Sequence, residues 1–468
     1  MAAGIDGTAS LPETNMTISS LSRQLFACLA ALCLLPSAWA VIPIEHWTQA
    51  NGVQVYLVQS HSLPMVDVRI DFDAGARRDP VGKVGLASAT AAMASRGLRA
   101  SADGPALDEN GLSEAWADLG ASFGGSASSD RMGFSLRSLT YPDLLGKVVA
   151  LAARQLGEPA FPADSWARER EQLIASIKES ETRPATIAAK AFASAVYGDH
   201  PYGKQMTETS LANITVTDMR AMFDRMILAC RAKVSVVGDV TREQADALVG
   251  GLFAHVGAGA ATGPCPALVP VPEVAQLQGP GVVRAIPFES AQAHVLIGQP
   301  GIRRNDPDFL ALTVGNYVLG GGGFVSRLYS EVREKRGLSY SVYSYFAPAL
   351  HAGAFTVGLQ TRPDQAAQAI ALSRDVVARF VRDGPTEQEL QAAKSNLVGG
   401  FALRLDSNRK LLDNVANIAW NGLPLNYLDT WTQAVEAITV AEVKSAFARV
   451  LRPESMVTVV VGGRDAGP

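Results

Sequence analysis

Hydrophobic residues recur along the chain with two different periods, and each period predicts a different element. Near the start, Val53, Val55 and Leu57 alternate with other residues, and the same two-residue period runs through residues 66–72 after a turn at residues 61–64. Side chains two positions apart point to the same face of a strand. These two segments therefore predict a β-hairpin with one buried face.

The following segments predict helices and further strands in mixed order. Helical patterns cover residues 84–93, 107–119, 142–156 and 165–181 and begin again at Thr217, and strand patterns cover residues 121–126, 132–139 and 232–237. Helices mixed with antiparallel strand pairs are typical of layered α+β domains. We therefore predict an α+β fold in which sheets are backed by helices.

An internal repeat appears when the chain is shifted on itself by 224 positions. Ile214, Thr215, Val216, Phe223, Arg225, Val236, Val237 and Gly238 then coincide with Ile438, Thr439, Val440, Phe447, Arg449, Val460, Val461 and Gly462. Each copy reads as a capped helix, a turn and a terminal strand. Residues 257–280 are rich in proline and glycine and form a natural linker. The sequence thus predicts two similar domains, residues 41–256 and 281–468.

Length and charge limit the possible classes of protein. A chain of 468 residues is long for a single core, and its 48% hydrophobic residues are enough to build two. The formal net charge is −4, and basic residues are dispersed among acidic ones. We therefore expect no nucleic-acid partner.

Residues 1–40 have the pattern of a secretory signal peptide. Arg23 precedes an apolar run at residues 25–35, and the small residues before Ala40 predict cleavage that leaves Val41 first. No later run is long enough to span a bilayer, so we expect an exported, periplasmic protein without a membrane anchor. Cys230 and Cys265 remain in the mature chain, either as a disulfide or as two thiols.

Residues 319–345 hold the pattern with the clearest chemical meaning. Four glycines should form a flexible loop, after which Ser326 is expected to cap a short helix that Gly337 ends in a left-handed conformation. Arg333 in the last turn and Tyr340 at the start of a strand should then face one cleft. Taken alone, the same residues also fit a helix-end arginine that complements the helix dipole and an amphipathic strand tyrosine.

This segment resembles the C-terminal half of the pitrilysin/insulinase family of zinc peptidases. The matching positions are Ser326-Arg327-Leu328, Val332-Arg333, Gly337-Leu338 and Tyr340. The resemblance implies two α/β sandwich domains in tandem, forming half of a clamshell. It also implies that Arg333 and Tyr340 hold the substrate while the glycine loop guides the peptide. The loop glycines are Gly320, Gly321, Gly322 and Gly323.

The family's zinc site has no counterpart in this chain. Active members carry H-x-x-E-H on one helix, where residues i and i+4 share a face, and a third ligand on a later helix. The four positions are occupied here by Ser88, Ala91, Ala92 and Ser176. None of the six histidines lies within five residues of another histidine or of a cysteine, and no G-x-S-x-G motif occurs. We therefore expect no metal or cofactor in this chain.

Three hypotheses follow, and the sequence leaves them open. In the first, the chain is the zinc-free subunit of a heterodimeric peptidase, and a homologous H-x-x-E-H subunit supplies the zinc for cleavage of peptide substrates. In the second, it is a catalytically dead scaffold or peptide-binding protein. In the third, it is a peptidase that acts alone through another site.

Overall fold

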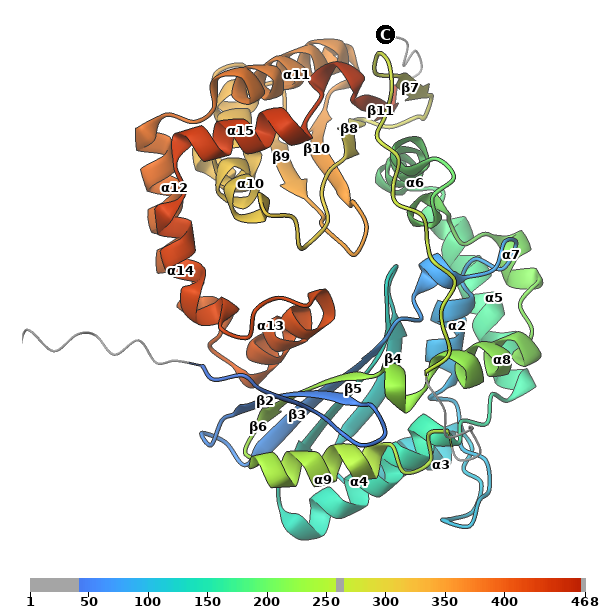
Figure 1. Cartoon of the computed structure of the whole chain (residues 1–468). Coiled ribbons are helices and arrows are strands. Elements are labelled where there is room, and N and C mark those ends of the chain that lie inside the picture. Colours follow the sequence, from blue (N-terminus) through green and yellow to red (C-terminus); the bar gives the residue numbers. More distant parts are fainter. Residues whose placement is uncertain (1–41, 258–264, 464–468) are drawn as a thin grey trace, which may run out of the picture. The chain divides into compact units, whose positions relative to one another are not determined.

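Two β-sheets, one from each half of the chain, organise the computed structural model, which describes residues 42–257 and 265–463 (Figure 1). The first sheet contains β1 (Glu45–Thr48), β2 (Gln54–Gln59), β3 (Met65–Phe72), β4 (Ser122–Ala127), β5 (Met132–Leu139) and β6 (Lys233–Gly238). The second contains β7 (Val283–Ile286), β8 (Ala293–Pro300), β9 (Ser341–Phe346), β10 (Ala354–Thr361) and β11 (Val457–Val461). Their orders are β1-β2-β6-β3-β5-β4 and β7-β11-β8-β10-β9. The predicted α+β fold with one sheet in each half is confirmed.

The predicted hairpin of β2 and β3 is wrong, because β6 lies between these two strands. β6 pairs in parallel with β2 and antiparallel with β3, and in the second sheet β11 likewise pairs in parallel with β7. The sequence of β6, Lys-Val-Ser-Val-Val-Gly, is mostly apolar, and all its residues after Lys233 are buried. Such a strand is favoured at the centre of a sheet, where both faces are covered. Each sheet is therefore mixed and not purely antiparallel.

Helices cover one face of each sheet. In the first half these are α2 (Leu86–Met93), α3 (Glu109–Asp118), α4 (Pro142–Gly157), α5 (Ala163–Ser180), α7 (Glu208–Ala212), α8 (Val216–Met226) and α9 (Arg242–Leu252). In the second half they are α10 (Phe309–Asn316), α11 (Ala366–Asp383), α12 (Glu387–Gly399), α14 (Tyr427–Ala437) and α15 (Val440–Val450). Each group encloses its own apolar core with the sheet.

The predicted repeat is confirmed by the elements themselves. Helices α8 and α15 begin and end 224 positions apart, and each opens with a threonine capping box. The capping residues are Thr215, which bonds the Asp218 N–H at 3.2 Å, and Thr439, which bonds the Glu442 N–H at 3.2 Å. A capping box satisfies free donors at a helix start, so the sequence signal and the structure agree.

The two halves exchange one helix each. Helix α6 (Pro184–Tyr197) packs on β8 and β11 of the second sheet, and α13 (Asn408–Asn421) packs on β6 and β3 of the first (Figure 1). The two helices are also 224 positions apart at both ends. The sequence boundary at residues 256–281 is therefore a boundary along the chain, whereas each packed unit contains a helix from the other half.

The surfaces under the two exchanged helices differ in polarity. Phe192 and Val196 of α6 pack on an apolar face of the second sheet. Under α13 the first sheet carries the buried carboxylates Asp67 and Asp71, and the Lys233 ammonium donates to the Ala419 carbonyl at 2.7 Å. A cation at the C-terminus of a helix complements its dipole. The α13 contact is therefore more polar than the α6 contact.

A disulfide and hydrogen bonds attach the described part of the linker to the first half. Cys230 and Cys265 form a disulfide, which decides the alternative that the sequence left open. Beyond it, Pro266 O accepts a bond from Arg231 at 2.6 Å, and Pro272 O lies 3.0 Å from the Nε2 atom of His200. Residues 265–272 thus run along the first half.

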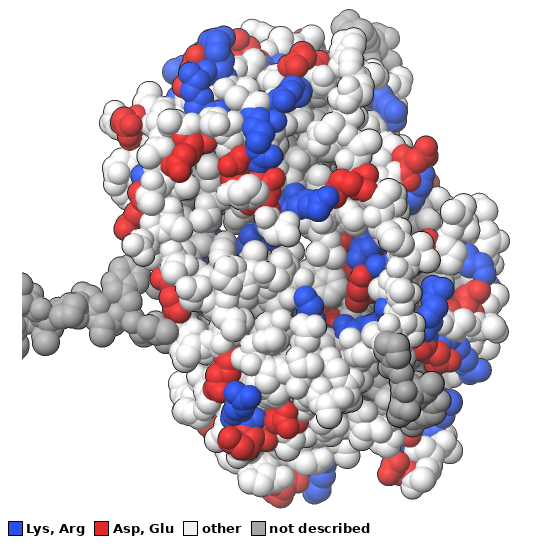
Figure 2. All heavy atoms as spheres, in the orientation of Figure 1, with Lys and Arg blue, Asp and Glu red and all other residues white. Residues whose placement is uncertain are grey.

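On the face shown in Figure 2, basic and acidic side chains alternate without a large patch of one sign. This matches the dispersed charges of the sequence. Within the described residues, no helix combines the length and apolar character needed to cross a membrane. The predicted signal peptide, residues 1–40, lies outside the described residues.

Candidate functional site

Arg333 and Tyr340 come together on the second half. Arg333 lies in a helical segment that extends from Arg327 to Glu334, and its Cζ atom is 4.7 Å from the centre of the Tyr340 ring. Gly337 has φ +61° between them, and its N–H donates to the Arg333 carbonyl at 2.8 Å. Only glycine adopts this conformation at little cost. The predicted left-handed turn therefore brings the two side chains together.

Two further aromatic rings complete the surroundings of Arg333. The Tyr329 ring lies 4.8 Å and the Phe324 ring 6.0 Å from the guanidinium carbon. Phe324 and Tyr340 are 70% and 77% exposed, so this cluster opens to solvent. Flat aromatic faces attract a cation, and they fix its position without using its N–H donors. Arg333 is therefore held in place, and no hydrogen bond from its guanidinium occurs in the part of the chain that the structure describes.

The glycine segment is more ordered than the sequence suggested. Gly320 and Gly321 belong to a wide helical turn, Tyr317–Gly321, and of the four glycines only Gly323 has a positive φ, +61°. Gly320 is buried, and a Cβ atom added there would lie 2.4 Å from the Ser344 hydroxyl of β9. Gly320 thus permits close packing on β9, and the prediction of a loop is wrong for Gly320 and Gly321.

Ser326 is not the helix cap that the sequence predicted. Its hydroxyl donates to the Gly323 carbonyl at 2.8 Å, and the helical segment that follows has no side-chain cap. The same carbonyl also accepts the Ser326 N–H at 3.1 Å, so the backbone and the side chain of Ser326 together close this turn. Ser326 therefore stabilises the end of the glycine segment.

The four positions aligned with the zinc site do not fit a metal. Ser88 and Ala92 on α2 are half-buried, Ala91 is fully buried in the core, and Ser176 on α5 is exposed. Alanine offers no ligand atom, and zinc prefers thiolate, imidazole and carboxylate to a serine hydroxyl. A Cβ atom added at Gly125 of β4 would lie 2.8 Å from the Ala91 carbonyl, so the strand packs tightly on this turn of α2. Helix α2 is thus a core helix.

Neighbouring charged groups around α2 are satisfied within the protein. The Asp79 carboxylate accepts the N–H groups of Gly85 at 2.7 Å and Ala87 at 2.9 Å, where α2 begins. Burial raises the pKa of Asp79 to about 6, and these bonds oppose the rise. Arg96 pairs with Glu109 and, at 2.6 Å, with Glu169 on α5. These carboxylates therefore serve as a helix cap and ion-pair partners.

One cluster of potential metal ligands occurs within residues 42–257 and 265–463. Asp103, Glu158 and His255 have ligand atoms within 4.8 Å of one another. Arg154 already pairs with Glu158 at 3.1 Å, and Asp103 is exposed. The guanidinium supplies the positive charge that a cation would bring. The cluster is therefore best described as an ion-pair network.

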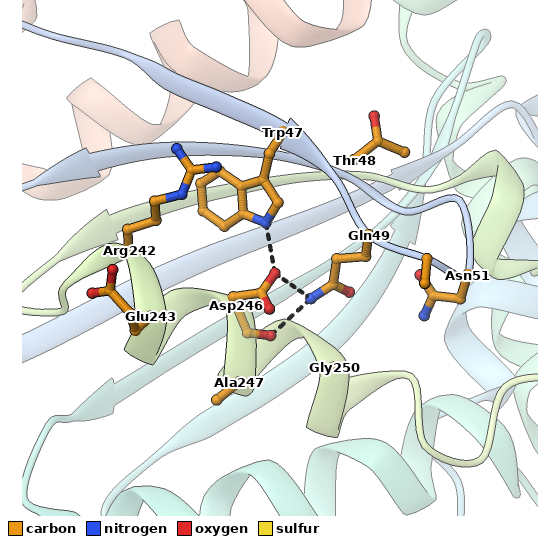
Figure 3. Close-up of a pocket in the computed structure, with 10 residues that line it drawn as sticks. Trp47, Thr48, Gln49, Asn51, Arg242, Glu243, Asp246, Ala247 and Gly250 are labelled. Atoms are coloured by element: carbon orange, nitrogen blue, oxygen red, sulfur yellow. Dashed lines mark hydrogen bonds between the residues drawn. The ribbon is translucent and has the colours of Figure 1, made fainter.

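A groove of about 790 Å³ lies beside the edge strand β1 (Figure 3). Its polar groups bond mainly to one another: Asp246 accepts from Trp47 Nε1 at 2.6 Å and from Gln49 Nε2 at 2.8 Å. Arg242 stacks on Trp47 at 4.7 Å. None of the aligned family positions lines this groove. It therefore stands apart from the Arg333 cluster.

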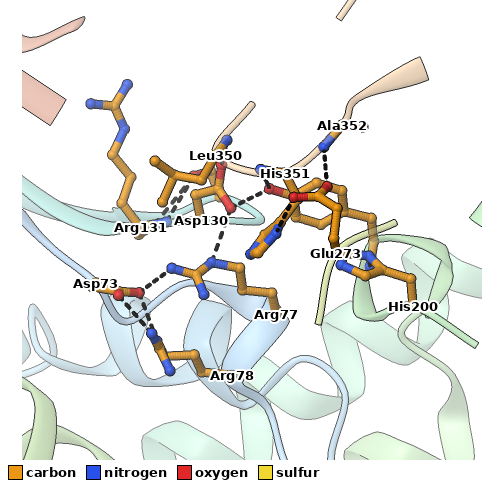
Figure 4. Close-up of polar contacts among 12 residues, drawn as sticks. Asp73, Arg77, Arg78, Asp130, Arg131, His200, Glu273, Leu350, His351 and Ala352 are labelled. Atoms are coloured by element: carbon orange, nitrogen blue, oxygen red, sulfur yellow. Dashed lines mark hydrogen bonds and ion pairs between the residues drawn. The ribbon is translucent and has the colours of Figure 1, made fainter. Parts of the chain in front are cut away.

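A buried polar clamp connects the first half to the β9–β10 hairpin (Figure 4). Asp130 accepts the Tyr202 hydroxyl at 2.5 Å and the Leu350 N–H at 3.0 Å, and its Oδ1 atom lies 3.0 Å from Arg77 Nε. Burial and the bond to Asp130 raise the pKa of Tyr202 well above its ordinary value, so the phenol remains a donor. The loop that follows β9 is therefore fixed by groups from the first half.

Histidine and glutamate side chains extend this clamp. His351 Nδ1 lies 3.3 Å from Glu273 of the linker, and Glu273 also accepts the Ala352 N–H at 2.8 Å. His200 Nδ1 accepts the Tyr202 N–H at 3.1 Å, which requires a neutral ring. Burial lowers the pKa of His200. The members of the clamp are far apart in the chain, so the sequence did not predict that they meet.

Comparisons with known proteins agree with this architecture. Residues 54–210 match the profile described as "Insulinase (Peptidase family M16)", and residues 213–397 match "Peptidase M16 inactive domain". A solved peptidase M16 inactive domain from Pseudomonas fluorescens is 34% identical, with a TM-score of 0.83 over 91% of this chain and 99% of that one. A Helicobacter pylori protease shares the fold, with a TM-score of 0.78, 19% identity and coverage of 90% and 100%.

Related sequences carry two kinds of description. A protein of Helicobacter pylori described as a non-peptidase homolog is 25% identical over 398 residues, which is 84% of this chain and 87% of its own. An uncharacterized zinc protease of Mycobacterium bovis is 29% identical over 328 residues, covering 69% and 74% of the two chains. Similar sequences thus include a protein described as a peptidase and one described as a non-peptidase.

Proposed function

Because this chain belongs to the peptidase M16 family and is of its inactive type, we propose that it is the zinc-free subunit of an exported heterodimeric peptidase. The observation that carries the proposal is that Arg333 and Tyr340 lie side by side while the zinc positions hold no ligand. A homologous subunit with H-x-x-E-H would supply the zinc and the general base. This chain would supply two groups that bind the substrate.

The proposed roles follow from the chemistry of the two side chains. Arg333 has free N–H donors and binds a main-chain carbonyl of the peptide. Tyr340 is exposed and donates its hydroxyl to the oxyanion that develops on the cleaved carbonyl. A donor directed at a developing negative charge stabilises the transition state more than the substrate, and so raises the rate.

Export is the second part of the proposal. The signal-like residues 1–40 support transport to the periplasm. The disulfide between Cys230 and Cys265 also supports it, because disulfides persist in oxidising compartments and are rare in the cytosol.

The test is kinetic and uses the mature chain mixed with an H-x-x-E-H subunit. Tyr340→Phe should lower kcat on the order of 10²–10³, as loss of one oxyanion donor typically does. Arg333→Ala should also raise KM, because a contact to the bound substrate is lost. Zinc content and complex mass, measured by mass spectrometry and light scattering, should not change.

Tyr141 provides the matched control, since it is an exposed tyrosine on the first half. Tyr141→Phe should leave turnover unchanged. Full turnover in both the Arg333 and the Tyr340 variants would refute the proposed roles and favour a scaffold. Peptide cleavage by this chain alone, at the same rate as the mixture, would refute the heterodimer.

A further inference from the structure

Arg333 has an unusual lack of partners for a half-buried arginine. Three aromatic rings surround its guanidinium, from Phe324, Tyr329 and Tyr340. Among the described residues, no carboxylate or hydrogen-bond acceptor contacts it. A guanidinium presents five N–H donors in a fixed plane, a shape that matches the two oxygens of a carboxylate. The cluster is therefore a donor site without an acceptor.

Arg327, on the same helical segment, shows the complete form of this arrangement. Its guanidinium lies 5.1 Å from the Phe380 ring, and it also binds the Glu389 carboxylate through Nε at 2.7 Å and Nη2 at 2.6 Å. Burial alone would raise the pKa of Glu389, but bonds from Arg327 and Thr386 lower it to about 2. Arg327 also donates to the Gly384 carbonyl at 3.1 Å, so Arg333 has the aromatic support of Arg327 but neither the carboxylate nor the carbonyl.

The acidic residues nearest in sequence do not fill the site. Glu331 forms ion pairs with Lys335 at 2.6 Å and with Arg336 at 2.7 Å. Glu334 directly follows Arg333, and successive residues of a helix do not face each other. From residue 327 to 336 the segment carries four basic and two acidic residues, so its charge favours an anion. Within residues 42–257 and 265–463 the chain therefore supplies no acceptor for Arg333, and a bound molecule can supply one.

We infer that Arg333 binds the free α-carboxylate at the C-terminus of a peptide, while the Tyr340 hydroxyl keeps the oxyanion role proposed above. This inference rests on the proposed function, because it names the class of peptide that the same pair takes. The carbonyl that Arg333 holds is then that of the last residue, and the peptide is bound by its C-terminal end. Cleavage that uses this contact releases short C-terminal products.

The experiment compares two peptides that differ only at this group. One labelled peptide is made as the C-terminal acid and as the C-terminal amide, and binding to the isolated full-length chain is measured by fluorescence anisotropy. The acid should bind about five- to tenfold more tightly, as expected for one charge-assisted bidentate contact near the surface. The preference should shrink in high salt.

Two arginine variants separate this site from the general charge of the segment. Arg333→Gln should abolish the preference for the acid. Arg336 lies one turn from Arg333 and is already paired with Glu331. Arg336→Gln removes the same positive charge and should retain the preference for the acid. Equal affinity of wild-type protein for acid and amide would overturn the inference, as would equal loss in both variants.

The outcomes remain distinct from those of the proposed function. If acid and amide bind equally but Arg333→Ala still slows the mixed complex, Arg333 holds an internal carbonyl, and only the carboxylate inference fails. If the acid preference depends on Arg333 but turnover does not, the heterodimeric role of Arg333 fails and the carboxylate site stands.

Discussion

Replacing Asp130 with Asn should weaken the contact between the first half and the β9–β10 hairpin. Asp130 is only 8% exposed; it accepts hydrogen bonds from Tyr202 and Leu350, and its carboxylate forms an ion pair with Arg77. In the Asn variant the amide oxygen can take the place of Oδ1, where it accepts from Tyr202 and lies beside Arg77. Its NH₂ group then faces the Leu350 N–H, and a buried donor is left without an acceptor.

The magnitude follows from these two losses. An unsatisfied buried N–H costs about 1–3 kcal/mol. Arg77 is 6% exposed and would lose one of two carboxylates while keeping Asp73. Because breaking a buried ion pair completely costs about 3–5 kcal/mol, the partial loss adds less. We expect the free energy of unfolding to fall by roughly 2–4 kcal/mol.

Urea unfolding followed by tryptophan fluorescence measures this change, and limited proteolysis reports on the hairpin. Asp364→Asn is the matched control, because Asp364 is 66% exposed and pairs with Arg362 on the surface. It should shift stability by less than about 0.5 kcal/mol. Asp130→Asn should also speed cleavage within residues 347–353. Equal stability and equal proteolysis of the two variants would refute the clamp.

Three further predictions concern α2, the buried histidine and the glycine segment. Ala91→Glu should cost about 3 kcal/mol or more in urea unfolding, because it buries a carboxylate in the core, whereas Ala92→His at a half-buried position should cost about 1 kcal/mol or less. The pKa of His200 is lowered in the folded protein, so the unfolded chain takes up a proton at a higher pH than the folded chain. The free energy of unfolding should therefore decrease as pH falls below about 6.5, and His200→Gln should flatten its slope between pH 7 and pH 5. Gly320→Ala should lower the free energy of unfolding by roughly 1–3 kcal/mol, because its Cβ atom would lie 2.4 Å from a β9 side chain. Gly323→Ala meets no atom within 4 Å, but φ is +61° there, so the loss should be about 1 kcal/mol. Urea unfolding measures both changes.

The sequence was informative wherever a local signal and the final packing coincide. The capped helices α8 and α15 and the left-handed turn at Gly337 depend on residues close in the chain, and they appear as predicted, although α8 begins at Val216 and not at Thr217. Arg333 and Tyr340 are only seven positions apart, so a single turn decides that they meet. Local chemistry was sufficient for this part of the site.

Features set by distant parts of the chain could not be predicted in this way. Helix α6 is apolar on several sides, and nothing in its pattern indicates that it packs on the sheet of the other half. The place of β6 between β2 and β3 depends on pairing with residues more than 160 positions earlier. Asp130 and Leu350 meet across 220 positions. Such contacts are fixed by the topology of both sheets.

The position of the Arg333–Tyr340 pair does not depend on α2. Gly337 and rings of the second half position the two side chains, and among the described residues none of their contacts involves α2. The first half reaches this region through Asp130 and Tyr202, which hold the loop beyond β9. Its expected contribution to catalysis is therefore support of the hairpin. If so, Asp130→Asn should lower turnover of the mixed complex only to the extent that it loosens the hairpin, and a lower temperature that restores resistance to proteolysis should restore turnover as well.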